Sequence, residues 1–149
     1  MIKKFLPLAI LPLVVACNNN SNQEAQDSDS SAVTFVTLDP GHFHAALVQK
    51  TALPGVDSNV YVYAPEGEDL QLHLKRIEGF NTRSEAPTHW NEQVYTGPDF
   101  FQKMIDEKKG NVVVMAGNNQ KKTEYIFKTV DAGMNVLADK PMAINAEGF

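Results

Sequence analysis

The stretch Asn111–Ile144 constrains the fold of this chain more than any other part of it. A short run at Val112–Met115, apolar and mostly β-branched, has the pattern of a strand buried on both faces. A helical pattern follows it, and a second short strand is expected at Asn135–Ala138. Strand, helix and strand at this spacing form one right-handed crossover of a parallel sheet. The chain is therefore predicted to contain a parallel α/β sheet.

Polar residues follow both strands of this crossover. Asn118 and Asn119 are helix-capping residues after the first strand, and Gly133 suits the left-handed position just past the helix end. Asp139 and Lys140 follow the second strand. Parallel α/β sheets carry their chemistry at the carboxyl ends of their strands. We therefore expect these side chains to meet at one edge of the sheet.

Strand and helix patterns alternate through the rest of the chain. Further strands are predicted at Val33–Leu38, Val60–Tyr63 and Gln93–Tyr95. Further helices are predicted at Ala45–Leu53, at Leu70–Ile77 with Gly79 as the end signal, and at Pro98–Lys108. This alternation is typical of an α/β fold, here a doubly wound parallel sheet of the Rossmann-like type.

Two apolar features are predicted to belong to the core. Trp90 lies in the polar segment Asn81–Asn91, which we expect to be a loop; the ring either fills the core or faces a ligand, and the core is favoured. The helix after it carries an apolar stripe at helical spacing that we expect to be buried rather than to contact a cofactor. This stripe consists of Phe100, Phe101, Met104 and Ile105.

Charge and cysteine content exclude several function classes. The formal net charge is −5, and Arg76 and Arg83 are the only arginines, so the basic surface of a nucleic-acid-binding protein is not expected. The single cysteine, Cys17, excludes a disulfide framework and a cysteine metal cluster.

The amino terminus reads as an export signal. Lys3 and Lys4 precede an apolar run, Phe5–Ala16, that is too short to span a bilayer. The run ends in Leu13–Cys17, which resembles a bacterial lipobox, and this resemblance implies cleavage before Cys17 and lipid on that cysteine. A plain signal peptide with a chance cysteine is the alternative.

The predicted domain organisation follows from this signal. Residues 1–16 are expected to be a signal peptide, and residues 17–32 a lipidated cysteine and a disordered tether without large apolar side chains. Residues 33–149 are expected to be a nucleotide-binding domain that is incomplete at its carboxyl end. The protein would then sit at the bacterial cell envelope and contact the membrane through its lipid anchor only.

The turn after the first strand stands where dinucleotide-binding folds carry G-x-G-x-x-G. Only Gly41 matches; Asp39 and His44 occupy the other two glycine positions. A carboxylate here competes with phosphate for the same amides unless hydrogen bonds hold it away. Gly41, His42 and Phe43 are candidate cofactor-binding residues, and a plain strand-to-helix turn is the alternative.

The pair His42-x-His44 also suggests a metal-binding site. His73 and His89 complete a set of four histidines, but their spacing matches no ligand template, so we expect no metal. Capped or partly buried histidines are the alternative.

Glu66 is a candidate ribose-binding acid after the second strand. It lies two residues later than the usual position, and a solvated residue in the next helix is an equal alternative. No arginine stands nearby for a 2′-phosphate, so the sequence does not distinguish NAD from NADP.

Three segments resemble the glucose–fructose oxidoreductase / inositol dehydrogenase (Gfo/Idh/MocA) family. That family has a strand ending near Pro-Asn, a helix with an Ala-Gly turn, and a strand closing in Glu-Lys-Pro. Here these stand as Gly117-Asn118-Asn119, Ala132-Gly133 and Asp139-Lys140-Pro141. The resemblance covers about residues 33–149, which corresponds to the family's nucleotide-binding domain only.

The resemblance implies an oxidoreductase that uses NAD or NADP on a sugar, cyclitol or related polyol. By analogy Lys140 lies near the nicotinamide and assists proton movement or holds the substrate oxygen, and it is the candidate catalytic residue. Asn118, Asn119 and Pro141 line the cofactor site, and Asp139 orients Lys140. A cis peptide is expected at Lys140-Pro141.

Departures from the family leave a second function open. Lys122 stands where the family usually has histidine, and two fingerprint glycines are replaced. The family's α/β substrate domain, which supplies a catalytic His or Asp and a route to homo-oligomers, is expected to lie outside this sequence. We expect the fragment alone to be inactive. The alternative is a non-catalytic envelope lipoprotein that binds a carbohydrate or a partner.

Overall fold

The computed structural model describes residues 33–148. The predicted signal peptide, the lipidation of Cys17 and the tether over residues 17–32 all lie outside this range. Within residues 33–148, no helix is long and apolar enough to cross a bilayer.

Five parallel strands form a single sheet, as the sequence predicts. They are β1 (Phe35–Leu38), β2 (Asn59–Tyr63), β3 (Asn91–Tyr95), β4 (Val112–Met115) and β5 (Asn135–Ala138). Their order across the sheet is β3-β2-β1-β4-β5, and every neighbouring pair is parallel. The chain adds strands on one side of β1 and then crosses to its other side. The sheet is therefore doubly wound, and its topological switch point lies between β1 and β4.

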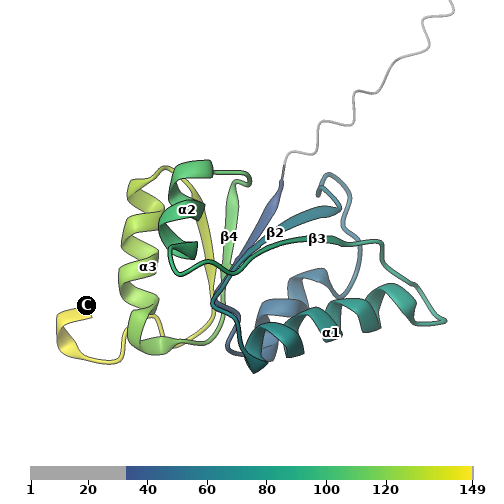
Figure 1. Ribbon diagram of the computed structural model, residues 1–149, viewed down its shortest axis with the longest axis horizontal. Helices are drawn as coiled ribbons and strands as arrows, with labels where there is room; N and C mark the ends of the chain where they lie inside the picture. Colours follow the sequence, from purple (N-terminus) through teal and green to yellow (C-terminus); the bar gives the residue numbers. More distant parts are fainter. Residues whose placement is uncertain (1–32, 149) are drawn as a thin grey trace, which may run out of the picture.

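Helices cover both faces of this sheet (Figure 1). One face carries the 3₁₀ helix η1 (Phe43–Gln49) and α1 (Glu68–Thr82), and the other carries α2 (Phe100–Glu107) and α3 (Asn119–Asp131). A short 3₁₀ turn, η2 (Ala146–Gly148), follows β5. This three-layer α/β arrangement confirms the predicted fold class.

Alternating side chains of β1 divide the core between the two faces. Val36 and Leu38 pack with the residues of α2 and α3, whereas Phe35 packs toward η1 and α1. Trp90 lies with Phe35, is 7% exposed, and donates from Nε1 to the carbonyl of Gln49 at 2.6 Å. The predicted core position of Trp90 is therefore confirmed, and so is the buried stripe of α2 around Met104.

The first helix differs from its prediction. A helix was expected over Ala45–Leu53, but the structure has a 3₁₀ helix over Phe43–Gln49. Ala46 and Gln49 are both fully buried. Because a 3₁₀ helix has three residues per turn, it places residues three apart on the same side.

The end of α1 also differs. Gly79 was expected to end this helix, but α1 continues to Thr82. Asn81 explains the extra turn: its Nδ2 donates to the carbonyl of Trp90 and its Oδ1 accepts from Thr88 and from the amide of Trp90. These bonds tie the last turn of α1 to the segment leading into β3, which begins at Asn91 rather than Gln93.

Helix α2 is shorter than predicted at its start. Pro98 precedes the helix, which begins at Phe100. Its end is set by Lys108, which adopts the left-handed conformation at φ 45° and donates its amide to the carbonyl of Met104. Gly110 follows, and a Cβ there would lie 2.7 Å from the carbonyl oxygen of Thr34, so this glycine allows close packing against the chain before β1.

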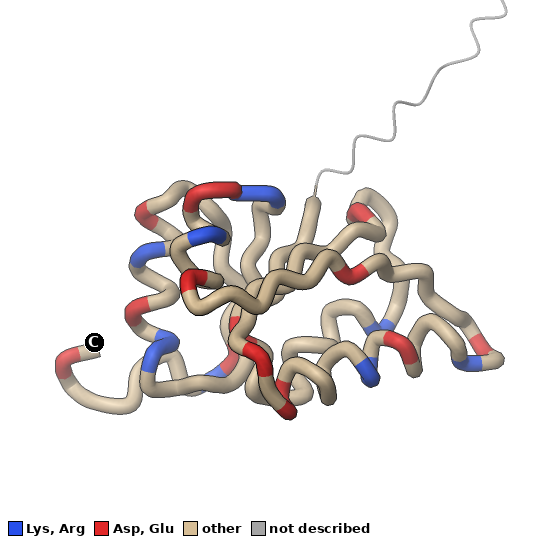
Figure 2. The backbone as a smooth tube through the Cα atoms, viewed as in Figure 1, with Lys and Arg blue, Asp and Glu red and all other residues tan. Residues whose placement is uncertain are grey.

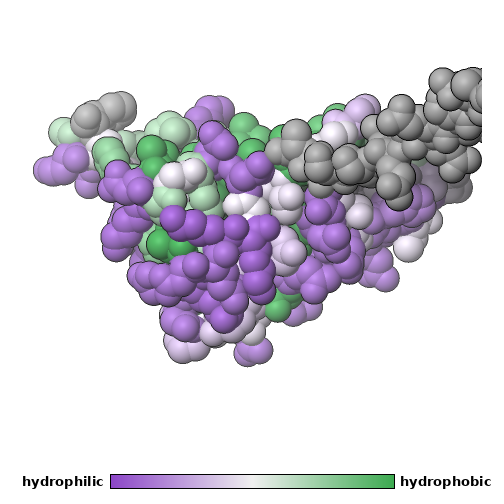
Figure 3. All heavy atoms as spheres, turned by 90° about the horizontal axis from the view of Figure 1, so that it is seen from above, coloured by the Kyte–Doolittle hydropathy of each residue, from purple (hydrophilic) through white to green (hydrophobic). Residues whose placement is uncertain are grey.

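The surface shown in Figure 3 is mostly hydrophilic, with smaller hydrophobic areas between the polar residues.

Candidate functional site

The turns that follow β1 and β4 approach each other at the switch point of the sheet. A Cβ built on Gly117 would lie 2.5 Å from the Cα of Gly41, and Gly117 has a φ of +102°. The amide of His42 donates to the carbonyl of Ala116 at 3.0 Å, which fastens the two turns together. A side chain at Gly117 would therefore separate them, and glycine is required there for steric and conformational reasons.

A pocket of ≈ 380 Å³ lies over these turns, at the carboxyl ends of β1, β4 and β5. Three turns that are far apart in the sequence contribute to it, so the predicted convergence at one edge of the sheet is confirmed. The lining residues are Gly41, His42, His44, Gly117, Asn118, Asn119, Asp139 and Lys140.

Three of the predicted site residues lie elsewhere. Phe43 is 44% exposed and packs against the rings of His42 and His44 rather than lining the pocket. Pro141 is exposed beside Lys140, and the peptide bond between them is cis, as expected. Glu66 belongs to a separate pocket at the end of β2.

Asp39 does not compete with a ligand for the amides of η1. It has a φ of 47°, and its Oδ2 accepts hydrogen bonds from Asn118 Nδ2 and, at 3.4 Å, from the hydroxyl of Tyr125. Burial and the Asp39 carboxylate raise the pKa of the Tyr125 hydroxyl above its ordinary value, so it remains a donor. Hydrogen bonds thus turn the carboxylate toward α3.

Asn118 has a different role from the predicted helix cap. It stands at the start of α3 in the left-handed conformation, at φ 42°, and its side chain makes no capping bond to that helix. The amide group is instead used to hold Asp39. The cap is lost because the turn after β4 must bend sharply at Gly117 before the helix begins.

Lys122 forms an ion pair with Asp139, one of the residues that line the pocket. Lys122 is 1% exposed; its Nζ contacts Asp139 Oδ1 and lies 3.2 Å from the carbonyl oxygen of the same residue. In the sequence, Lys122 stands out only as a departure from the family pattern. Its spacing to the buried Tyr125 and Thr129 is i, i+3, i+7, which places all three on the inner face of α3.

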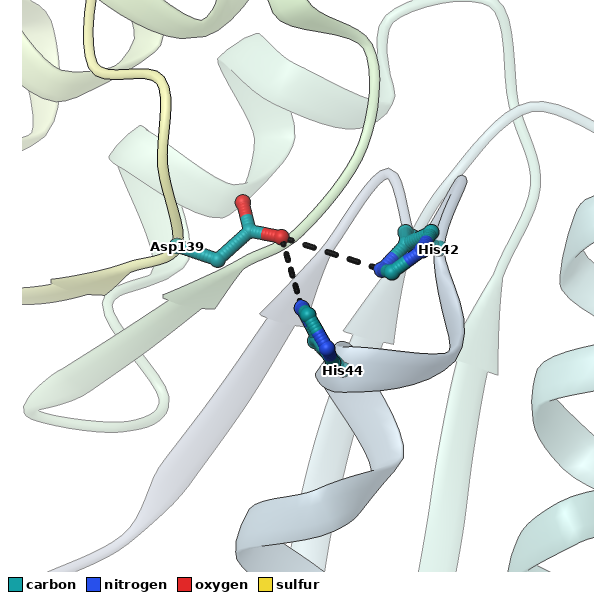
Figure 4. Close-up of side chains that lie close together, drawn as sticks. All are labelled: His42, His44 and Asp139. Carbon is teal, nitrogen blue, oxygen red and sulfur yellow. Dashed lines mark hydrogen bonds and ion pairs between the residues drawn. The ribbon is translucent and has the colours of Figure 1, made fainter.

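The second carboxylate oxygen of Asp139 faces two histidines (Figure 4). His44 Nδ1 lies 3.2 Å from Oδ2, and His42 Nδ1 lies 3.8 Å from it. Burial alone would raise the pKa of the Asp139 carboxyl, but the hydrogen bonds from Lys122 and His44 outweigh it and lower the pKa below its ordinary value. Asp139 is therefore the charged centre of the pocket wall.

The four histidines do not form one cluster, which a metal site built from all four would require. His73 is 2% exposed and lies beside Glu92, 3.9 Å between Nε2 and Oε2, and His89 lines a different pocket next to Trp90. His42 and His44 are instead joined by Asp139 from the far end of the chain. Sequence spacing could not show this, because the partner lies 95 residues away from His44.

The pocket at the end of β2 is acidic. Its volume is ≈ 210 Å³, and its lining includes the acidic residues Asp39, Glu66, Glu68 and Asp69 but no lysine or arginine. Figure 2 shows acidic residues where the chain leaves the sheet and enters α1. Asp39 and Pro40 contribute to this pocket and Gly41 to the larger one, so the β1 turn separates the two.

Two solved structures resemble this chain, and each is described as a "putative oxidoreductase". The protein from Parabacteroides merdae ATCC 43184 is 66% identical with a TM-score of 0.79, over 80% of this chain and 27% of that one. The protein from Yersinia pestis is 18% identical with a TM-score of 0.48, over 78% of this chain and 28% of that one. No family model and no curated protein matches the chain.

The chain spans 27% of the length of the Parabacteroides merdae protein, so the comparison concerns one part of a larger molecule. Over that part, the identity supports the Rossmann-like fold. Membership of the Gfo/Idh/MocA family stays a prediction.

Proposed function

We propose that this chain forms the nicotinamide-nucleotide-binding part of an oxidoreductase that acts on a sugar, cyclitol or related polyol. The observation that carries the proposal is the convergence of Gly41, Asn119 and Lys140 on one pocket at the switch point of a doubly wound sheet. Open α/β sheets bind their ligands in this crevice. The name of the 66% identical relative supports oxidoreductase chemistry at a coarse level.

The residues present fit a dinucleotide. The contact between Gly41 and Gly117 leaves bare backbone where a pyrophosphate must approach closely. Because the amides of Gly41 and His42 already donate to Asp39 and Ala116, phosphate contacts come from other groups of the pocket. The residues of the pocket at the end of β2 would hold the adenosine ribose, and Lys140 would stand on the nicotinamide side.

The charge of the ribose pocket favours NAD over NADP. The carboxylates of Glu66, Glu68 and Asp69 would repel a 2′-phosphate, and no lysine or arginine lines the pocket to offset them. Glu66 is exposed there and can accept hydrogen bonds from ribose hydroxyls.

Lys140 is the group proposed to act on the substrate oxygen. It is exposed, lines the pocket, and its ammonium has no acceptor within residues 33–148. Asp139, fixed by Lys122, holds the segment that presents Lys140. The bound nicotinamide supplies or accepts the hydride, while Lys140 holds the substrate oxygen and moves its proton.

Calorimetric titration of NAD⁺, NADH, NADP⁺ and NADPH into the chain tests this proposal. Calorimetry is preferred to fluorescence because Trp90 is buried against Gln49, away from the pocket. One equivalent of NAD⁺ should bind, with NADP⁺ at least about tenfold weaker. Lys140→Ala should weaken NAD⁺ binding, whereas the exposed Lys128→Ala on α3 should not.

No binding of any dinucleotide at millimolar concentration would eliminate the proposal and favour a non-catalytic binding protein. One observation favours this second function: the turn amides of Gly41 and His42 are occupied by the chain itself. Titration with sugars and cyclitols in place of dinucleotides would then identify the ligand class.

We also propose, from its amino-terminal sequence, that the protein is exported and anchored by lipid. Cys17 follows an apolar segment that resembles a lipobox. Incorporation of a labelled fatty acid into the expressed protein tests it, and Cys17→Ser should abolish the label. Persistence of the label in that variant would reject the anchor.

A further inference from the structure

We infer that His42, His44 and Asp139 form a binding site for a divalent transition-metal ion of the zinc type. The three residues come from two turns that are distant in the sequence and meet beside the pocket (Figure 4). The inference depends only on these side chains and not on the proposed nucleotide binding.

The ligand atoms are close to the positions that one ion requires. His44 Nδ1 lies 3.2 Å and His42 Nδ1 3.8 Å from Asp139 Oδ2. One ligand atom from each of the three residues lies within 4.8 Å of the other two. A tetrahedral zinc ion at about 2.0–2.2 Å from each ligand places the ligand atoms roughly 3.3–3.6 Å from one another. The histidine side chains are 46% and 40% exposed, so small rotations at the surface complete the geometry.

Lys122 orients the carboxylate for this role. Its buried ammonium group binds Oδ1 of Asp139, which leaves Oδ2 directed at both imidazoles. Metal-binding carboxylates are commonly fixed in this way by a hydrogen bond to the oxygen that does not face the metal. The lysine of this ion pair is 1% exposed, so the pair holds the Asp139 carboxylate in place.

The ring arrangement also suits a metal. The rings of His42 and His44 stand at 80° with centroids 4.3 Å apart, and Phe43 packs against both. Phe43 therefore limits the directions in which the imidazoles can turn.

Ligand chemistry selects the class of ion. Two imidazole nitrogens and one carboxylate oxygen suit zinc and its neighbours, whereas Mg²⁺ and Ca²⁺ prefer oxygen ligands throughout. Three protein ligands leave a fourth position open, and all three residues line the ≈ 380 Å³ pocket. Such an open position accepts water or a ligand oxygen.

Zn²⁺ titration by calorimetry, without nucleotide, tests the inference. Cys17→Ser is used as the background so that the only thiol of the chain cannot bind the ion. We expect one equivalent of Zn²⁺ to bind, with no saturable binding of Mg²⁺ under the same conditions. His42→Ala and His44→Ala should each weaken binding at least about tenfold.

His89→Ala is the matched control, because His89 is exposed and lies at a different pocket; it should leave Zn²⁺ binding unchanged. Urea unfolding of each variant confirms that the fold is intact. Absence of saturable Zn²⁺ binding at millimolar concentration, or equal binding by wild type and His44→Ala, would overturn the inference. Because the titration contains no dinucleotide, failure here leaves the proposed NAD binding separately testable.

Discussion

Asp139 is contacted by side chains from two elements that lie on opposite faces of the sheet. Lys122 reaches it from α3, and His44 reaches it from η1. Burying a charge is costly unless it is paired, so the Asp139 carboxylate stabilises the buried ammonium of Lys122. The contacts from Lys122 and His44 together position that carboxylate. The geometry of the pocket wall therefore depends on this one pair.

Lys122→Met should destabilise the chain by about 2–3 kcal/mol, since removing one member of a buried pair leaves the other unpaired. The expected loss is at the lower end because Asp139 is 19% exposed and keeps its contact with His44. Urea unfolding at neutral pH measures it. Lys128→Met is the control: its pair with Glu124 is exposed, so its cost should stay below about 0.5 kcal/mol.

A double-mutant cycle with Asp139→Asn makes the test specific to the pair. The double variant should be less destabilised than the sum of the two single variants. Strict additivity, or a Lys122→Met loss as small as that of Lys128→Met, would contradict the role given to the ion pair.

Gly117→Ala should lower the free energy of unfolding by more than about 3 kcal/mol. The added Cβ would lie 2.5 Å from the Cα of Gly41, and the residue also has a positive φ that alanine adopts at a cost. Gly133→Ala isolates the conformational part. Gly133 has a φ of +83° and nothing within 4 Å of the added Cβ, so about 1–2 kcal/mol is expected. Equal losses in urea unfolding would show that the two turns do not need their close contact.

The candidate site was partly predictable at this scale. The Asn118-Asn119 and Asp139-Lys140 segments follow strands, and that rule alone brings them to one edge of the sheet. The meeting of His44 with Asp139 and the burial of Lys122 were not predicted. They depend on side-chain directions across elements, which local spacing does not encode.

Helix α2 is tied to the sheet through Glu107. Its carboxylate accepts from the Tyr63 hydroxyl at 2.6 Å and pairs with Lys103 at 3.0 Å and Lys109 at 3.4 Å. The hydrogen bond from Tyr63, followed by that from Lys103, lowers the pKa of Glu107 from 4.5 to about 2. Burial raises the pKa of Tyr63, and the bond to Glu107 adds to this, so the tyrosine stays protonated.

This pKa shift predicts a pH-dependent contribution of Glu107 to stability. A carboxyl whose pKa is lower in the folded chain stabilises it fully above the unfolded value, near 4.5, and loses this as the pH falls toward 2. Glu107→Gln should therefore be less stable than wild type at neutral pH. The difference in stability between the two proteins should disappear as the pH falls from about 4.5 to about 2. Urea midpoints across the range measure the gap.

Glu85→Gln is the control for this series, because Glu85 is exposed and bonds to nothing within residues 33–148. Its midpoint should follow that of wild type at every pH. A gap between wild type and Glu107→Gln that stays constant with pH would contradict the assignment.

Strands were easier to predict than helices in this chain. The bounds of β4 and β5 agree with the sequence, because a buried parallel strand is a continuous apolar run between polar turns. The bounds of η1, α1 and α2 shifted because tertiary contacts decide them. Asn81 extends α1, and Lys108 ends α2 in the left-handed conformation.

At the scale of the molecule, the carboxyl edge of the sheet carries all of the proposed binding surface. The acidic pocket, the glycine contact and Lys140 follow one another from the end of β2 to the end of β5. The strand order produces this row, since β1 lies between β2 and β4. A dinucleotide extended across β1 would reach each part, and this crossing is the central claim.

A crystal structure of the chain grown with millimolar NAD⁺ tests that claim most directly. The account predicts density for the cofactor across the end of β1, with the pyrophosphate over Gly41 and Gly117, the ribose hydroxyls near Glu66 and the nicotinamide beside Lys140. Cofactor bound at another surface, or a carboxyl edge that stays empty at saturating NAD⁺, would contradict it.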